Sequence, residues 1–283
     1  MGNVIFLDHG PITMTLEAGR EGKPFPAAAE EGAKAVVWAF DSLTKSRYFP
    51  ESEKFVEYID QEVLNECPDV LKRMIESVRA LDEASFTPMA AVAGTFSDMA
   101  VEAMIEVGAD FALANNGGDI ACRIPPYKKY LRVGIISDLS KGNVTHAVTI
   151  PAHIGIGGIA TSGFGGRSFT LGVASAVTAM SNTASKADAA ATSIANACNC
   201  EDPGVERCLA YELDPMTDIA GLTVTRSLGK LRLESVESAL MNGIRRTEYL
   251  CETGFIASAI IFLGDRMDMR WGGSECPFKL ERA

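Results

Sequence analysis

Residues 157–196 read GGIATSGFGGRSFTLGVASAVTAMSNTASKADAAATSIAN, a glycine- and hydroxyl-rich segment that runs into an alanine-rich helix. That helix carries Asp188, Thr192 and Asn196. Few side chains in the segment are bulky enough to anchor a hydrophobic core, so much of it is expected to serve a ligand rather than burial. We therefore expect the chemistry of the protein here, in a loop over residues 158–168 and a helix over residues 185–198.

The chain on either side of this segment changes character along its length. Periodicity predicts a strand pair over residues 3–17 and helices over residues 26–46, 51–64, 68–82, 88–107, 203–212 and 234–252. Strands are expected over residues 110–115, 119–124, 131–137, 145–150, 168–171, 173–180 and 255–263. Strands grouped with strands and helices with helices favour an α+β fold with mixed helices and a mainly antiparallel sheet. No linker is apparent, so we expect a single domain over residues 1–283 with a two-lobed interior.

Composition narrows the class of partner. The 283 residues carry a net charge of -11, which repels phosphate backbones and argues against nucleic acid. No secretory signal opens the chain, and the most apolar run, residues 255–263, spans about half of the ~20 residues that a membrane helix needs. We expect a cytoplasmic protein with a small-molecule ligand and no membrane partner, and the sequence leaves homo-oligomerisation open.

The cysteines indicate free thiols. Their number is odd, no export signal precedes them, and their spacing is not that of a zinc site. The seven are Cys67, Cys122, Cys198, Cys200, Cys208, Cys251 and Cys276.

One stripe of the predicted helix over residues 185–198 is a candidate metal site. Asp188, Thr192 and Asn196 follow one another at intervals of four residues, so their side chains lie along one face of a helix. Their oxygens are hard donors of the kind that suits Mg²⁺. Alternatively, Asp188 only favours the helix dipole in the first turn and the other two form a polar face. Spacing alone leaves both interpretations open.

Two other segments supply main-chain donors. Residues 87–94, TPMAAVAG, open a helix with small side chains, so their first-turn amides are available to an anion such as a phosphate. Small residues equally permit close helix packing. Residues 115–119, NNGGD, lie between two strand patterns and predict a tight hairpin, whose glycines also allow backbone amides to approach a ligand.

Four motifs taken in order resemble the uncharacterised branch of the ApbE-like family. They are TPMAAVAG (87–94), NNGGDI (115–120), GIATSGFGGRS (158–168) and ADAAAT (187–192). That family includes the flavin transferases that move FMN from FAD to a protein threonine. The resemblance covers roughly residues 10–200 and implies a T-fold-related α+β architecture, with FAD or FMN and Mg²⁺ as expected ligands.

The resemblance also implies roles for individual residues. Asp188 and Thr192 match the magnesium ligands of the family's Asp-x-x-Ala-Thr helix. The ATSG turn at 160–163 and the Gly-Gly-Asp hairpin at 117–119 match segments that line the flavin pocket. The candidate cofactor contacts are Met89, Ala90, Ala91, Gly94, Asn116, Gly117, Gly118, Asp119, Thr161, Ser162, Gly163, Arg167 and Ser168.

One motif departs from the family. The transferases carry a His-x-x-Asp-Pro motif shortly after the ATSG turn, whereas residues 165–172 here read GGRSFTLG. The usual catalytic group is missing, which argues against FMN transfer to a protein. A phosphate-bearing ligand still fits, because Arg167 is able to pair with a phosphate bidentately and Ser168 with glycine amides is able to complete its cradle.

Three hypotheses follow. The first is an ApbE-like protein that binds a flavin or similar phosphorylated molecule, with Mg²⁺, as a transferase or hydrolase. The second is a small amide or ester hydrolase with Ser162 or Thr161 as nucleophile and His153 as general base. The third is a metabolite-binding protein that has kept the fold without the chemistry.

Overall fold

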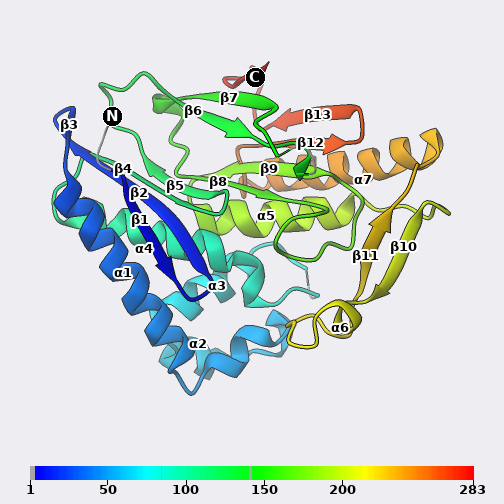
Figure 1. Ribbon diagram of the computed structural model, residues 1–283, viewed down its shortest axis with the longest axis horizontal. Helices are drawn as coiled ribbons and strands as arrows, with labels where there is room; N and C mark the ends of the chain where they lie inside the picture. Colours follow the sequence, from blue (N-terminus) through cyan, green and yellow to red (C-terminus); the bar gives the residue numbers. More distant parts are fainter. Residues whose placement is uncertain (1–3, 84, 140–141) are drawn as a thin grey trace. The chain divides into compact units, whose positions relative to one another are not determined.

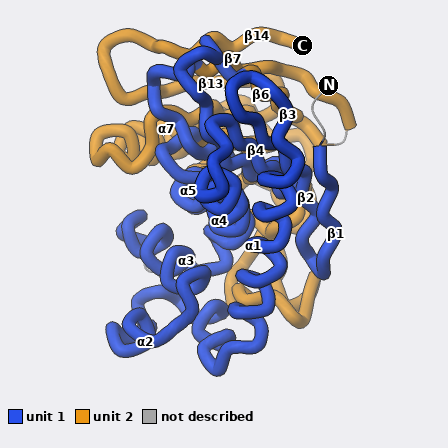
Figure 2. Tube along the Cα trace, turned by 90° about the vertical axis from the view of Figure 1, so that its left-hand side faces the viewer, with its two compact units in different colours: residues 1–131, 151–160, 180–189 blue, residues 132–150, 161–179, 190–283 orange. Residues whose placement is uncertain are grey.

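The chain divides into two compact units. The computed structural model describes residues 4–83, 85–139 and 142–283. Unit 1 comprises residues 1–131, 151–160 and 180–189, and unit 2 comprises residues 132–150, 161–179 and 190–283 (Figure 2). The chain passes between the units within strands β6 (Tyr130–Ile135), β7 (His146–Pro151), β8 (Gly158–Ser162) and β9 (Ala176–Ser181) and within helix α5 (Ala184–Ala197). The single domain expected from the sequence stays a prediction.

Unit 1 is built on an antiparallel sheet. Its strands β1 (Ile5–His9), β2 (Ile12–Arg20), β4 (Phe111–Asn116), β5 (Asp119–Arg123) and β8 are adjacent in that order, and β3 (Lys23–Pro24) pairs with β2. On β2, Ile12, Met14 and Leu16 are buried and alternate with more accessible polar residues. This alternation confirms the strand pair predicted over residues 3–17, of which residue 3 lies outside the described part.

Helices α1 (Pro26–Thr44) and α4 (Val92–Glu106) pack against each other and against this sheet (Figure 1). Gly32 of α1 lies where the two helices meet, and a Cβ there would lie 2.9 Å from Cγ of Met104 and 3.1 Å from Cδ2 of Leu16. The helix pair therefore sits directly on the buried face of β2. Further helical elements described in unit 1 are η1 (Phe49–Glu53), η2 (Val56–Tyr58), α2 (Gln61–Glu66), α3 (Asp69–Arg79), η3 (Pro88–Ala91) and η5 (Ala152–Ile154).

Unit 2 contains strands in three groups. Strands β9, β12 (Ser258–Leu263) and β13 (Arg266–Trp271) are neighbours, and helix α7 (Leu233–Glu252) packs against the last two. A second sheet has the order β14 (Lys279–Arg282), β7 (His146–Pro151), β6 (Tyr130–Ile135). The third is the hairpin of β10 (Val205–Leu209) and β11 (Thr223–Leu228), with the short helix α6 (Ala210–Leu213) following β10. Every residue of β12 is buried, as the apolar run from Ala259 to Leu263 indicates.

The α+β class with mainly antiparallel sheet is confirmed, and two predicted helices are wrong. Residues 51–64 form parts of η1, η2 and α2, because Val56 leaves the helical path to donate its N–H to the carbonyl of Phe86 at 2.9 Å. Residues 203–212 form β10 and part of α6, because β10 pairs with β11, a strand that the sequence did not predict.

The glycine-rich segment over residues 157–196 differs from the prediction in two places. Residues 158–162 are strand β8 rather than loop, and residues 168–171 are not a strand. Gly158 pairs with Ala121, and a Cβ on it would lie 2.2 Å from the main-chain nitrogen of Ala184. Glycine here permits a close approach of two backbones inside a strand, rather than marking a loop.

The cysteines and the apolar helices bear on two further predictions. All seven cysteines lie in the described part and are free thiols, as predicted. Within that part, no helix combines the length and the apolarity needed to cross a membrane.

Candidate functional site

Helix α4 begins with main-chain amides that have no partner inside the helix. The predicted helix start at residues 87–94 is confirmed, with the 3-10 turn η3 over Pro88–Ala91 followed by α4 from Val92. Met89 and Ala90 are partly buried, and Ala91 and Gly94 are buried. Because the first N–H groups of a helix lack intrahelical acceptors, this end of α4 is suited to an anion.

The anion at this helix start is a carboxylate of the chain itself. Oδ2 of Asp188 accepts the N–H of Gly94 at 2.9 Å. Asp188 keeps some accessible surface, but its carboxyl group is closely enclosed, and burial raises its pKa well above the ordinary value. The nearby charge of Asp119 raises this pKa further, whereas the amides of Gly94 and Ala93 lower it. Asp188 lies beyond the first turn of α5, so the interpretation through its own helix dipole is wrong.

The hairpin predicted at residues 115–119 is confirmed and is held against α4. Gly117 and Gly118 have φ of 66° and 115°, as a two-residue turn between paired Asn116 and Asp119 requires. Ser97 of α4 donates its hydroxyl to the carbonyl oxygen of Asp119 at 2.8 Å. The side-chain nitrogen of Asn116 donates to the carbonyl of Ala93 at 3.4 Å.

The other end of the Asn116 amide is unusual. Asn116 is buried, and its Oδ1 has no hydrogen-bond partner among the residues that the structure describes. An unpaired buried oxygen costs free energy, so its presence beside the first turn of α4 indicates a place where a donor or a cation is accommodated.

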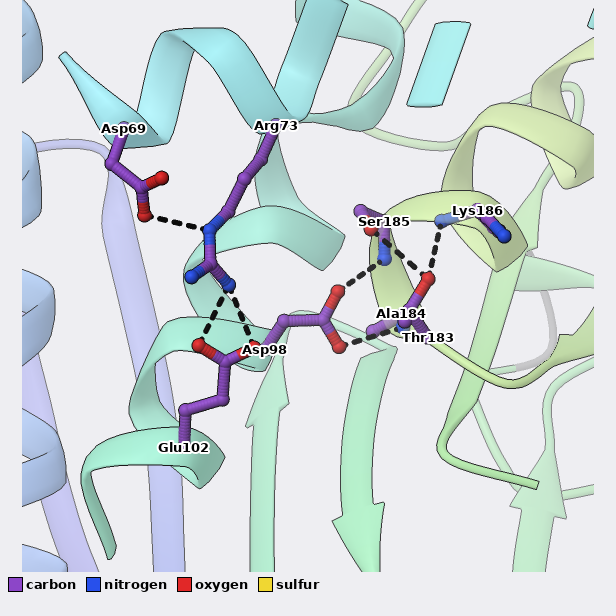
Figure 3. A network of polar contacts seen from close by, with 8 residues as sticks. All are labelled: Asp69, Arg73, Asp98, Glu102, Thr183, Ala184, Ser185 and Lys186. Carbon is purple, nitrogen blue, oxygen red and sulfur yellow. Dashed lines mark hydrogen bonds and ion pairs between the residues drawn. The ribbon is translucent and has the colours of Figure 1, made fainter. Parts of the chain in front are cut away.

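A second buried carboxylate, which the sequence did not single out, completes this arrangement. Oδ1 of Asp98 on α4 accepts the N–H of Ala184 at 2.8 Å, and its Oδ2 accepts the N–H of Ser185 at 2.9 Å (Figure 3). Burial raises the pKa of Asp98, and these two amides act in the opposite direction. Asp98 looks like an ordinary helix residue in the sequence, because its partners are backbone groups that carry no side-chain signal.

Glycine allows the two helix starts to approach this closely. A Cβ on Gly94 would lie 2.2 Å from the carbonyl oxygen of Ala184 and 2.8 Å from the nitrogen of Ser185. The close-packing interpretation of the 87–94 motif is therefore confirmed. The Gly94 amide is bonded to a carboxylate of the chain, and binding of a ligand anion at this helix start stays a prediction.

The remaining predicted contacts belong to unit 2. Thr161 and Ser162 lie on strand β8 rather than in a loop, and the hydroxyls of Thr161 and Thr178 are 2.9 Å apart. A Cβ on Gly163 would lie 2.7 Å from the carbonyl oxygen of Ser175, so this glycine also marks a close backbone approach. Arg167 and Ser168 are exposed.

Asn196 does not direct its oxygen to a shared metal site, so that part of the predicted stripe is wrong. Its Oδ1 accepts the hydroxyl of Thr170 at 3.1 Å and the N–H of Leu171 at 2.9 Å. Asn196 thus fixes the loop after residue 168. Thr192 is partly buried and lies one turn after Asp188 on the same helix.

His153 lies in η5, which belongs to unit 1, and its side chain is exposed. The catalytic roles of His153, Ser162 and Thr161 stay predictions. Across the described residues, no group of three or more His, Cys, Asp or Glu side chains is arranged to hold a metal ion.

Solved structures of low sequence identity share this fold. The ApbE protein of Thermotoga maritima superimposes with a TM-score of 0.53 and 13% identity, over 94% of this chain and 96% of its own. The apo form of the flavinyl transferase ApbE of Pseudomonas stutzeri gives a TM-score of 0.52 and 12% identity, over 95% and 94% of the two chains. The fold therefore defines an ApbE-like α+β protein.

The chain belongs to the family described as "AbpE bacteria", whose model matches residues 2–270. This confirms the resemblance that the four motifs indicate. A UPF0280 protein of Methanococcus vannielii is 32% identical over 194 residues, which cover 65% of this chain and 74% of the relative. A UPF0280 protein of Methanosarcina barkeri is 37% identical over 140 residues, a match that spans 53% of the relative's length.

Proposed function

We propose that this protein binds a flavin nucleotide or a similar phosphorylated small molecule together with Mg²⁺, and acts on it as a transferase or hydrolase. The observation that carries the proposal is the acidic centre of unit 1, which we define as Asp188, Asp119 and Asn116 beside the first turn of α4. There a partly accessible carboxylate is held in place by a helix-start amide, next to a second carboxylate.

The donors of the acidic centre fit a hard divalent cation. Asp188 and Asp119 supply carboxylates, and Asn116 supplies a buried oxygen that no group in the described part of the chain hydrogen-bonds. Oxygen ligands of this kind are those that Mg²⁺ takes in proteins, usually with several waters. A cation would offset the repulsion between the two carboxylates and lower the raised pKa of Asp188. Thr192, one turn further along α5, is the second metal ligand proposed by the resemblance.

A phosphorylated ligand follows from the same chemistry. Mg²⁺ held by one or two carboxylates commonly takes substrate phosphates as further ligands. Membership of the family, together with the names of the structural neighbours, supports a flavin nucleotide. The contacts proposed in unit 1 are Met89, Ala90, Ala91, Gly94, Asn116, Gly117, Gly118 and Asp119. The contacts proposed in unit 2 are Thr161, Ser162, Gly163, Arg167 and Ser168.

The reaction is proposed at the level of its class. The His-x-x-Asp-Pro motif is absent, which argues against FMN transfer to a protein. If FAD is hydrolysed at its pyrophosphate, water supplies the incoming oxygen and the products are FMN and AMP. A protein that binds FAD without releasing either product over a long incubation would instead be a metabolite-binding protein.

Calorimetric titration of FAD and FMN tests the proposal. We expect the affinity for FAD to fall at least about tenfold, or about 1.4 kcal/mol, when Mg²⁺ is replaced by EDTA, and similarly in Asp188→Asn. The matched control is Asp265→Asn, which changes an exposed aspartate in the turn between β12 and β13. Absence of flavin binding in every condition would contradict the proposal, and chromatography of the incubated FAD distinguishes an enzyme from a binding protein.

A further inference from the structure

Helices α4 and α5 each place a carboxylate on the N-terminal amides of the other. Asp98 of α4 accepts the amides of Ala184 and Ser185, which open α5, at 2.8 and 2.9 Å. Asp188 of α5 accepts the amide of Gly94, which lies in the first turn of α4, at 2.9 Å. The two helices are therefore locked together reciprocally, through charge-assisted bonds to backbone rather than through side-chain pairs.

We propose that Asp98 is a positioning residue for the acidic centre, and that it fixes where the Asp188 carboxylate lies by holding the start of α5. Asp188 follows Ala184 by four residues, about one helical turn, so a fixed first turn leaves its carboxylate little freedom. This inference rests on the proposed role of Asp188 as a cation ligand. Since Mg²⁺ demands near-ideal octahedral geometry, a small displacement of one ligand weakens binding.

Three observations separate this role from ordinary helix capping. The first is that α5 already has a local cap, because the hydroxyl of Thr183 accepts the N–H of Lys186 at 3.4 Å. The second is that Asp98 is about nine-tenths buried and comes from another helix, whereas an ordinary cap is a residue of the same chain turn at the helix start.

The third observation is the contact between main chains. A Cβ on Gly94 would lie 2.2 Å from the carbonyl oxygen of Ala184, so the start of α5 lies directly against α4. Gly94 and Asp98 are themselves one turn apart on α4, and both bond to α5: Gly94 donates to Asp188, and Asp98 accepts from Ala184. A shift of α5 against α4 therefore changes the position of Asp188 relative to the Gly94 amide that it accepts.

The Asp98 carboxylate is bonded to the start of α5, through the amides of Ala184 and Ser185 and also through the Ser185 side chain. Arg73 of α3 pairs with Glu102, one turn after Asp98, and with Asp69, each at 2.7 Å (Figure 3). The charge of Glu102 contributes to the raised pKa of Asp98.

The test uses Asp98→Asn with Asp202→Asn as a matched control. Asp202 in unit 2 likewise accepts two backbone amides, those of Gly204 at 2.7 Å and of Arg232, just before α7, at 3.0 Å. Both changes therefore remove one charge from a carboxylate bonded to two amides, and only Asp98 takes part in the reciprocal bonds between α4 and α5.

Two measurements are made on the full chain. The first is amide hydrogen exchange at Gly94 without metal, because this amide has no intrahelical acceptor and its protection depends on Asp188. The second is calorimetric titration with MgCl₂ alone. We expect Asp98→Asn to raise the exchange rate and the Kd for Mg²⁺ at least about tenfold each. We expect Asp202→Asn to change neither by more than about twofold.

Each outcome decides the inference. Unchanged exchange at Gly94 in Asp98→Asn overturns it, whatever the Mg²⁺ affinity, because the effect would then not pass through Asp188. If the wild-type protein binds no Mg²⁺ but exchange at Gly94 is still faster in Asp98→Asn, the positioning role is supported and the proposed function is contradicted. If Asp98→Asn does not fold, Asp98→Glu keeps both acceptor oxygens but displaces them. We expect Asp98→Glu to raise the exchange rate at Gly94 and the Kd for Mg²⁺ by a smaller factor. An exchange rate at Gly94 equal to that of the wild type would overturn the inference.

Discussion

The acidic centre of unit 1 and the glycine-rich loop of unit 2, residues 163–168, carry parts of the same predicted ligand pattern but are held in opposite ways. In the acidic centre a carboxylate and a helix-start amide meet, and Gly94 lies against the backbone of α5. In the loop, residues 165–168 are exposed, and the amide of Gly166 bonds to the carbonyl of Gly163 at 3.2 Å. Before the exposed part, Phe164 donates its N–H to Ala174 at 2.8 Å, and after it Leu171 donates to Asn196 at 2.9 Å.

The difference separates two uses of glycine that look alike in the sequence. In the acidic centre, glycine removes a side chain so that backbones can touch and fix a carboxylate. In the exposed loop, Gly165 has a φ of 85° and no atom within 4 Å of an added Cβ, so glycine serves the turn. A metal ligand needs the first arrangement, since its geometry must be set by a rigid support.

Gly94→Ala is expected to have the largest effect on stability. The new Cβ would lie 2.2 Å from the carbonyl oxygen of Ala184, which is backbone and cannot move aside cheaply. We expect a loss of about 3 kcal/mol in the free energy of unfolding, the upper part of the usual range for overpacking. Urea denaturation followed by circular dichroism measures it.

The control for this change is Gly221→Ala. Gly221 has no heavy atom within 4 Å of an added Cβ and no positive φ, so its change is expected to stay within about 0.5 kcal/mol. Similar losses for the two substitutions would show that α4 and α5 do not lie in backbone contact, and the comparison between the two regions would fail.

Asp188→Asn is expected to stabilise the metal-free protein at neutral pH. The folded-state pKa of Asp188 is raised above its ordinary value of 3.8, so the protonated form is favoured in the folded protein. Its contribution to stability is thus fully present below about pH 3.8 and is lost as the pH rises through the folded-state pKa. Asparagine keeps an acceptor for the Gly94 amide and escapes this loss.

Thermal unfolding in EDTA measures this prediction. We expect the Tm of Asp188→Asn to exceed that of wild type at pH 7 on the order of a few degrees, and the difference to shrink towards pH 4. Added Mg²⁺ should reduce the difference, because a ligand that binds the folded state stabilises only the protein that holds it. A variant less stable than wild type at neutral pH would show that the carboxylate is not strained by burial.

Local patterns predicted the elements that depend on local residues. The apolar spacing of α1 and α7 and the turn residues of the β1–β2 and β4–β5 hairpins are readable in the sequence, and they were confirmed. Strand β8 was not predicted, because its glycine, Gly158, reflects contact with Thr183 and Ala184, far along the chain. Strand β10 was not predicted because its pairing with β11 outweighs the helical spacing of its residues.

The candidate site divides in the same way. Asp188, Asn116 and Asp119 stand out because carboxylates and amides in motifs have recognisable chemistry. Asp98 was missed because its partners are two backbone amides, and the one available signal was its spacing of four residues from Gly94. Asn196 was misassigned because spacing on a helix places an oxygen on a face but does not identify the group that it bonds.

Arg167→Ala is expected to have the smallest effect on stability and a selective effect on binding. Arg167 is exposed, so its removal should change the free energy of unfolding by no more than about 0.5 kcal/mol. If it pairs with a phosphate, the affinity for FAD should fall about tenfold while the affinity for Mg²⁺ alone stays the same. Calorimetry with each ligand checks both, and Arg245→Ala on the exposed side of α7 is the matched control. Equal losses of FAD affinity for Arg167→Ala and Arg245→Ala would show that Arg167 only contributes a general attraction for an anion. A loss of Mg²⁺ affinity in Arg167→Ala would show that the loop supports the metal, so that the two regions do not differ in kind.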